Sequence, residues 1–273
     1  MTQETVISPK QRIRIDWAEL HRYRELFYYF AWRDLKVRYK QSVMGVGWAV
    51  FQPLATMLVF TLFFHEVAGI GSGDVPYTVF SFSGLLYWNL FSTGLLRASN
   101  SLVDNQGVIT KIYFPRVIPV VSSTIVALVD FLVAFVLLVA LMAYYGIAPG
   151  VAGLLFLIPS ILLTMAAATG FGLLFATLNA KYRDVRQALP FFVQTALFVT
   201  PVIYPIALVP DSYQWALYLN PMTGVLDGFR AWVLGEGEVN AALIWLGVLT
   251  TAVACVAGLA YFRSREREFA DYL

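Results

Sequence analysis

Four basic side chains lie within eight positions near the start of the chain: Arg33, Lys36, Arg38 and Lys40. Cations spaced in this way on a helix can bind lipid phosphates, because their long stems lie on apolar surface while the charge stays at the headgroup level. At 100° per residue over residues 20–40, Arg33, Lys36 and Lys40 fall on one stripe opposite an apolar one. We expect a basic amphipathic helix that lies on a membrane and acts as a lever or gate. The alternative is that these charges only fix the topology.

The composition indicates that the chain lies in a membrane, as such a helix requires. Of 273 residues, 59% are hydrophobic and 13% are charged, and the mean hydropathy is +0.69. That charged share is about half of the share in ordinary soluble domains, so we predict an integral membrane chain. The net charge of +2 is small, and we expect no nucleic-acid partner. Cys255 is the one cysteine, which excludes an intramolecular disulfide and a cysteine-based metal site, and we expect no metal.

Six apolar windows are long enough to cross a bilayer, which takes about 20 residues of helix. Every Lys and Arg except Arg230 falls before the first window, after the last, or in the second and fourth connections. Cytoplasmic loops are enriched in these residues, so both termini are expected in the cytoplasm. Residues 1–40 are then a cytoplasmic segment with the interface helix, 41–262 the transmembrane domain and 263–273 a cytoplasmic tail. The six spans are expected at about 43–65, 75–97, 117–145, 151–178, 188–208 and 239–262.

The last outer connection, residues 209–238, is too apolar for a wetted loop. It divides at Asn220 and Pro221 into two segments, each about half the length of a span. We predict a short helical hairpin over 211–235 that re-enters the outer leaflet, with Thr223 as a candidate cap of its second helix. A pair of helices lying flat on the membrane is the alternative.

Asp130 lies in the middle of the third predicted span. A carboxylate at that depth costs about 2.5 to 3.5 kcal/mol on insertion scales, so it normally faces a partner or a cavity. We favour a structural hydrogen bond over a role in transport chemistry. Aromatic rings near polar residues could line a path for sugars, although interfacial anchoring and packing explain aromatics in most membrane helices. The candidates for such a path are Trp48, Phe51, Tyr87, Trp88 and Tyr204.

Five blocks in this order resemble the ABC export permeases that move polysaccharides of the O-antigen, capsule and teichoic-acid groups. They are RDLKVRYKQSVMGVGWAVFQPL at 33–54, FPRVIPV at 114–120, LNAKYRDVRQALPFFVQ at 178–194, TPVIYP at 200–205 and LNPMTGVLDGFR at 219–230. The resemblance implies a multi-pass subunit of the bacterial cytoplasmic (inner) membrane that exports a lipid-linked polysaccharide, as in lipopolysaccharide biosynthesis. It also implies a homodimer joined to two ATPase subunits, which bind the ATP and Mg²⁺.

No GxxxxGK[ST] phosphate loop occurs in the sequence, so nucleotide binding is expected in a partner and no cofactor in this chain. We expect a polar coupling helix at 101–116 to dock on the ATPase, with a second contact at 181–187. The alternative for 181–187 is a plain basic loop. The expected coupling residues are Asp104, Asn105, Gln106, Lys111, Arg116, Lys181, Arg183, Asp184 and Arg186.

Arg33, Lys36, Arg38 and Lys40 are then expected to form an inner gate that meets the pyrophosphate of the lipid-linked polymer. The same fold could carry teichoic acid, another lipid or a drug. A membrane glycosyltransferase or hydrolase would need paired carboxylates, a histidine metal site or an activated nucleophile. The spans hold one carboxylate and His65 at a helix end, so we expect no catalytic residue. A simple channel would leave the basic helix and the polar helix without a purpose.

Overall fold

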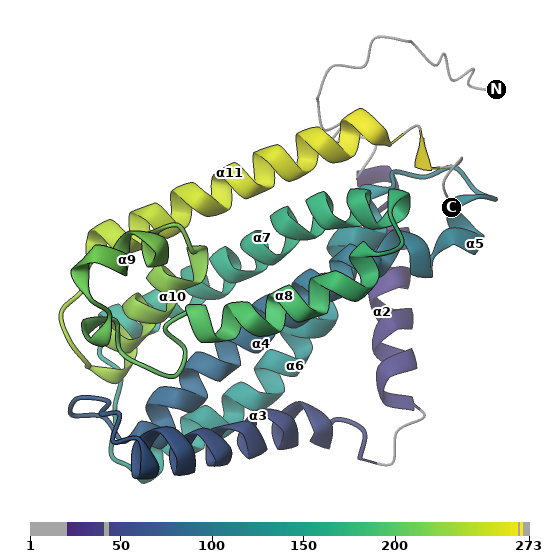
Figure 1. Cartoon of the computed structure of the whole chain (residues 1–273). Helices are drawn as coiled ribbons and strands as arrows, with labels where there is room; N and C mark the ends of the chain where they lie inside the picture. Colours follow the sequence, from purple (N-terminus) through teal and green to yellow (C-terminus); the bar gives the residue numbers. More distant parts are fainter. Residues whose placement is uncertain (1–20, 41–43, 267, 270–273) are drawn as a thin grey trace.

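The computed structural model describes residues 21–40, 44–266 and 268–269 (Figure 1). The predictions for residues 1–20, 41–43, 267 and 270–273 lie outside the described residues. The described part is helical and has no strand, which confirms the predicted all-helical class. Its elements are α2 (Arg24–Lys40), α3 (Gly47–Phe60), the π-helix η1 (Thr61–Val67), α4 (Tyr77–Asp104), α5 (Gln106–Ile109), α6 (Val117–Tyr144), α7 (Val151–Lys181), α8 (Val185–Val199), the 3-10 helix η2 (Ile206–Leu208), α9 (Asp211–Tyr218), α10 (Pro221–Phe229), the π-helix η3 (Arg230–Leu234) and α11 (Ala241–Arg265).

Five helices in the described part are long and apolar enough to cross a membrane. They are α3 with η1, α4, α6, α7 and α11. The helix of the fifth expected span, 188–208, is interrupted, because α8 ends at Val199 and the next helical element is η2. Thr200 is extended at φ −78° and ψ 139°, as expected of a residue whose α-conformation clashes with a following proline. The described residues therefore contain five candidate spans, and the sixth stays a prediction.

The helix α4 lies at the centre of the bundle, packed against α6 and α7 (Figure 1). The Tyr87 ring packs on Phe131 and Phe229, and its hydroxyl lies 2.7 Å from Oγ of Ser160 on α7. The helix α11 packs closely on α7 at Gly170. A Cβ added to this glycine would lie only 2.7 Å from the backbone nitrogen of Cys255. Such contacts between helices give α4 few exposed residues and fix the positions of the polar groups at its ends.

The two short helices predicted over 211–235 are present as α9 and α10, which meet at Asn220 and Pro221, and their re-entry into the membrane stays a prediction. Asn220 is the N-cap of α10, since its side chain accepts a hydrogen bond from the backbone nitrogen of Met222. Thr223 as the cap is wrong, and its side chain is buried inside the bundle. The second helix α10 packs on α11 and α7 and is largely buried, whereas half of the residues of α9 are exposed. The two halves of the hairpin therefore have different surroundings.

Candidate site at the α5 end of the bundle

The polar groups of interest lie at the end of the bundle that carries α5, which we call the α5 end (Figure 1). A second cluster of buried apolar side chains holds this end together. In it, Phe30 of α2 lies 5.7 Å, centroid to centroid, from Phe114 of the connection between α5 and α6. Phe262 of α11 and Phe269 of the tail pack edge to face at 5.1 Å. The cluster therefore joins the amino-terminal helix, the connection 105–116 and the carboxy-terminal segment.

Asp130 of α6 binds the last turn of α2. Its Oδ2 lies 2.5 Å from a terminal nitrogen of Arg38, and its Oδ1 accepts a hydrogen bond of 3.1 Å from Nε of Arg38. The hydroxyl of Tyr39 also donates to Oδ1. Burial and this hydrogen bond raise the pKa of Tyr39 to about 12, so the phenol stays protonated and remains a donor. The structural partner expected for Asp130 thus exists, and it belongs to a segment distant in sequence.

The four cations expected to form one inner gate separate into different surroundings. Arg38 points to Asp130, and Arg33 contacts its neighbour Asp34 at 2.6 Å. Lys36 and Lys40 are exposed, and with Arg33 they line a groove of about 370 Å³ along α2. Phe30 and Ala31 are the buried residues of this helix. Lys36 and Lys40 therefore stay exposed to a ligand, whereas Arg33 and Arg38 each have a carboxylate partner inside the chain.

The coupling helix expected over 101–116 is wrong in its extent. Residues 101–104 continue α4, because the sequence contains no helix breaker before Asn105, and the separate helix α5 has only four residues. The connection continues to Pro115, and Lys111 at its tip is exposed, as is Gln106 in α5. Asn105 donates from Nδ2 to the backbone oxygen of Ser101 at 2.7 Å. The predicted polar helix is thus one helical turn followed by an extended loop.

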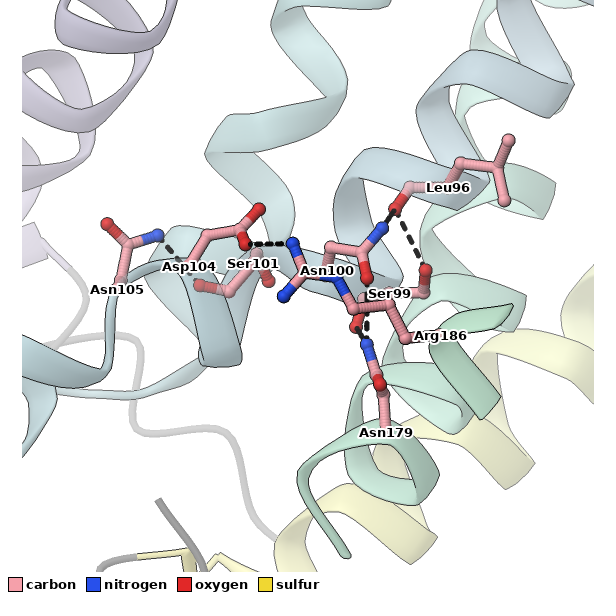
Figure 2. Close-up of polar contacts among 8 residues, drawn as sticks. All are labelled: Leu96, Ser99, Asn100, Ser101, Asp104, Asn105, Asn179 and Arg186. Atoms are coloured by element: carbon pink, nitrogen blue, oxygen red, sulfur yellow. Dashed lines mark hydrogen bonds and ion pairs between the residues drawn. The ribbon is translucent and has the colours of Figure 1, made fainter. Parts of the chain in front are cut away.

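The two regions expected to contact the ATPase lie beside each other. Arg186 of α8 forms an ion pair of 2.9 Å with Asp104 at the end of α4 (Figure 2). Asn179 of α7 donates to Oδ1 of Asn100 at 2.9 Å and to the backbone oxygen of Ser99 at 3.0 Å. These contacts tie the start of the connection 105–116 to the connection 182–184. A partner that docks on one connection would therefore meet both.

The other expected coupling residues lie at the surface or against the tail. Arg183 and Asp184 are exposed in the turn between α7 and α8, and the ammonium of Lys181 lies 5.2 Å from the centroid of the Tyr182 ring. Arg116 instead contacts the tail, where its guanidinium donates to the backbone oxygen of Glu266. The Glu266 carboxylate also accepts a bond of 2.8 Å from Arg263. Arg116 therefore connects the coupling loop with the carboxy-terminal segment.

The aromatic residues expected to line a path divide into two groups. Tyr87 and Trp88 are buried in the core of the chain, which favours packing as their role. Trp48 and Phe51 lie on the exposed side of α3, with ring centroids 5.5 Å apart. Tyr204 donates its hydroxyl to the backbone oxygen of Val199 at the broken end of α8. Among the five candidates, Trp48 and Phe51 on α3 are therefore the ones whose rings are exposed.

Sequence reasoning did not identify Arg230 as a structural residue, although it is the one basic residue of the outer connections. Its two terminal nitrogens donate to the backbone oxygens of Pro201 and Val202, each at 2.7 Å. Its guanidinium carbon lies 3.5 Å from the centroid of the Phe80 ring. A helix break leaves carbonyl groups without partners, and Arg230 satisfies two of those that follow α8. Burial lowers its pKa to about 10, so it remains charged at neutral pH.

The carboxylates of Glu236 and Asp227 act on Arg230 electrostatically, but among the described residues they form no hydrogen bond or ion pair with it. Burial raises the pKa of Glu236 to about 7, against the opposing effect of Arg230, and burial also raises the pKa of Asp227. Asp227 and Asp74 add negative charge around Glu236. One oxygen of Glu236, one of Asp227 and Nε of Arg230 are buried without a hydrogen-bond partner among the described residues. This cluster is therefore sensitive to pH.

Comparison with known proteins decides the family. The model of the family "ABC-2 type transporter" matches residues 25–234, which is more than half of the chain. The chain belongs to the ABC-2 type transporter family. The predictions of a transport subunit with a separate ATPase, and of a multi-pass permease of the bacterial inner membrane, are confirmed by this membership together with the apolar helices.

Relatives of this ABC-2 chain match it along nearly their whole length. The O-antigen export system permease protein RfbA of Klebsiella pneumoniae is 28% identical over 88% of this chain and 92% of its own. RfbA of Myxococcus xanthus is 29% identical over 93% of this chain and 97% of its own. The polysialic acid transport protein KpsM of Escherichia coli is 23% identical over 86% of this chain and 91% of its own. The resemblance expected from the sequence blocks is thus confirmed.

Proposed function

We propose that this chain is the permease subunit of an ATP-driven exporter that moves a lipid-linked polysaccharide, of the O-antigen or capsule type, across the inner membrane. One observation carries the proposal: relatives named for the export or transport of such polymers align with 91% to 97% of their own length. Each of these alignments spans both the coupling connections and the hairpin of this chain. The proposal therefore concerns the whole transport subunit.

In this proposal, two copies of the chain form a homodimer joined to two ATPase subunits. The segment formed by α8, residues 200–205 and η2 completes the sixth crossing, which brings both termini to the cytoplasm. The α5 end then faces the ATPase, and α2 lies at the inner surface of the membrane. ATP and Mg²⁺ bind in the partner. The Arg186–Asp104 ion pair supports this arrangement, because it joins the two connections that would receive the ATPase.

The basic residues of α2 would meet the lipid-linked polymer as it enters. Arg33, Lys36 and Lys40 line a groove of about 370 Å³ together with aromatic side chains of the same helix. Guanidinium and ammonium groups bind phosphates strongly, and aromatic faces can pack on sugar rings. Arg38 would act indirectly, by holding the last turn of α2 on Asp130. Trp48 and Phe51, exposed on α3, are the aromatics proposed for the polymer path.

The proposal is tested by reconstituting this chain with its ATPase in liposomes and adding a lipid-linked polysaccharide on the ATPase side. We expect polymer to become accessible to a glycosidase on the opposite side only when ATP is hydrolysed. Parallel reactions with a lipid-linked teichoic acid and with a lipophilic drug identify the cargo. Failure of the chain to copurify with an ATPase, or ATP-independent passage of polymer, would contradict the proposal.

A coupling test uses the exposed residue Lys111. We expect Lys111→Glu to reduce polymer export per ATP hydrolysed while the complex still assembles, because the reversed charge repels an ATPase surface that suits a cation. The matched control is Arg24→Glu, the same reversal at an exposed arginine in the first turn of α2. Equal coupling in both variants would remove Lys111 from the docking surface.

A further inference from the structure

A cavity of about 330 Å³ lies between α2, α4 and α6 at the α5 end. Polar and charged side chains from all three helices line it, and the ones that matter here are Arg33, Arg38, Arg97, Ser101 and Ser123. Arg97 is on α4, about two helical turns before the end of the helix at Asp104. The cavity lies on the inner side of α2, whereas the groove with Lys36 and Lys40 is a separate space along that helix. The α5 end thus contains a second basic site.

The other arginines of this cavity have carboxylate partners. Arg38 pairs with Asp130 and Arg33 pairs with Asp34, at 2.5 Å and 2.6 Å. Asp104, on the cavity wall, is neutralised by Arg186 at 2.9 Å. These pairs leave neither a spare carboxylate for Arg97 nor an unbalanced negative charge that would repel an anion.

Arg97 itself forms no hydrogen bond and no ion pair within residues 21–40, 44–266 and 268–269. Its side chain is partly buried, and the charges acting on it are those of Arg38, Asp130 and Asp34. The Arg97 nitrogens are not among the fully buried unpaired atoms, but partial burial still costs a guanidinium part of its hydration without a bond in return. A ligand that supplies a negative charge in the cavity would remove this cost.

Two hydroxyl groups beside Arg97 suit the same ligand. Ser101 donates to the backbone oxygen of Ala98 at 2.7 Å, and Ser123 donates to that of Val120 at 2.8 Å. Those carbonyl oxygens belong to helices and have backbone donors of their own. Each hydroxyl can therefore rotate toward an anion without leaving its carbonyl oxygen unsatisfied. Arg97 offers a planar fork of donors that fits two oxygens of one phosphate.

We propose that Arg97, with Ser101 and Ser123, binds a phosphate ester anion in the cavity between α2, α4 and α6. The inference rests on the proposed function, in which a lipid-linked polymer and membrane phospholipids are both present at this end of the chain. Either of them could supply the phosphate. The bound anion compensates the charge of Arg97 and joins α4 to α6 directly behind α2. Its binding therefore affects the contact by which Arg38 holds α2 on α6.

The test uses the complex of this chain with its ATPase in phosphatidylcholine nanodiscs. Radiolabelled polyprenyl pyrophosphate and phosphatidylglycerol are titrated separately, and a dissociation constant is measured for each. For at least one probe we expect Arg97→Gln to raise the constant about ten- to a hundredfold, the usual effect of losing hydrogen bonds to a charged group. Arg97→Lys keeps the charge but loses the fork of donors. Its dissociation constant is expected to lie between those of the wild type and Arg97→Gln. The matched control Arg24→Gln, outside the cavity, is expected to bind like the wild type.

The pattern across probes identifies the source of the phosphate. Weaker binding of polyprenyl pyrophosphate alone identifies the polymer carrier as the source, and weaker binding of phosphatidylglycerol alone identifies a membrane lipid. Weaker binding of both probes shows that the site accepts any phosphate ester. Unchanged binding of both probes by Arg97→Gln overturns the inference. If Arg97→Gln does not assemble, Ser123→Ala is measured, and unchanged binding in that variant has the same consequence. Polymer export by the wild-type complex tests the proposed function separately, so the two failures are distinguishable.

Discussion

The ion pair between Arg38 and Asp130 predicts a measurable coupling between α2 and the bundle. The two side chains are 30% and 15% exposed, between a surface pair, which contributes less than about 1 kcal/mol, and a buried pair, whose rupture costs roughly 3 to 5 kcal/mol. We therefore expect Asp130→Asn to lower the free energy of unfolding by about 2 kcal/mol. The asparagine oxygen can still accept the hydrogen bond from Tyr39, so the loss reports the charge together with one acceptor for Arg38.

The two single variants are expected to differ. Asp130→Asn removes a carboxylate whose charge acts on Arg97 and leaves the like charge of Arg38, which also acts on Arg97. Arg38→Gln instead leaves Asp130 with a second cation nearby, because Arg97 remains. Asp130→Asn should therefore cost more than Arg38→Gln. Adding Arg38→Gln to Asp130→Asn should restore part of the loss, since it removes one of the two repelling charges.

The measurement is a double-mutant cycle on chemical unfolding in detergent micelles, with a second cycle on ATP hydrolysis stimulated by the lipid-linked polymer. The exposed pair Arg186–Asp104, also between two helices, is the control for the unfolding cycle, with an expected coupling below about 1 kcal/mol. Additive effects of Arg38→Gln and Asp130→Asn would refute the reasoning, because residues that do not interact contribute independently. A larger loss in Arg38→Gln than in Asp130→Asn would refute the role given to Arg97.

Three further predictions concern the two ends of the bundle. Glu236 has a pKa of about 7, above its usual value, so the folded chain binds this proton more tightly than the unfolded chain. The free energy of unfolding should therefore fall as pH rises from about 4.5 to 7. Thermal unfolding between pH 5 and 8 should show a smaller fall in Glu236→Gln than in the wild type. Arg230→Lys should destabilise the chain nearly as much as Arg230→Gln, by about 2 to 4 kcal/mol in chemical unfolding, since one ammonium does not replace a fork on two carbonyl groups. Glu266→Ala, which removes the carboxylate beside Arg116, should leave ATP hydrolysis intact and lower polymer export per ATP in liposomes, and unchanged export would contradict a role of the tail in coupling.

Hydropathy predicts the long spans because a bilayer imposes length and composition on each helix separately. The start of the second helix of the hairpin could also be predicted from the sequence. The Asn220–Pro221 pair carries both a cap and the first-turn proline favoured at helix starts. The helix break inside the fifth expected span was missed, for a local reason that was also present in the sequence. The motif TPVIYP contains two prolines within six residues, and Pro201 forces Thr200 out of the helix, whatever the hydropathy of the segment.

The side-chain partners were beyond the reach of sequence patterns. Asp130 and Arg38 lie 92 positions apart, and only the packing of α2 on α6 brings them together. The helical stripe correctly grouped Arg33 with Lys36 and Lys40, which line one groove. A stripe specifies which residues share a face of one helix, but it does not specify what each face meets. Arg97 was passed over for the same reason, because its unusual feature is the lack of a hydrogen-bond or ion-pair partner among the residues that the structure describes.

The apolar cluster at the α5 end determines how movement of the coupling connection would reach α2. Phe30 and Phe114 are both buried and lie in ring contact, so a shift of the connection either moves Phe30 or opens a void between the rings. A void costs about 24 cal/mol for each Å³, and close-packed interiors transmit strain for that reason. Phe30 lies two turns before Arg38 on the same helix, and a helix moves as a unit over that distance. A displacement of the connection therefore acts on the Arg38–Asp130 pair directly, which is why the strength of that pair should govern how readily α2 responds.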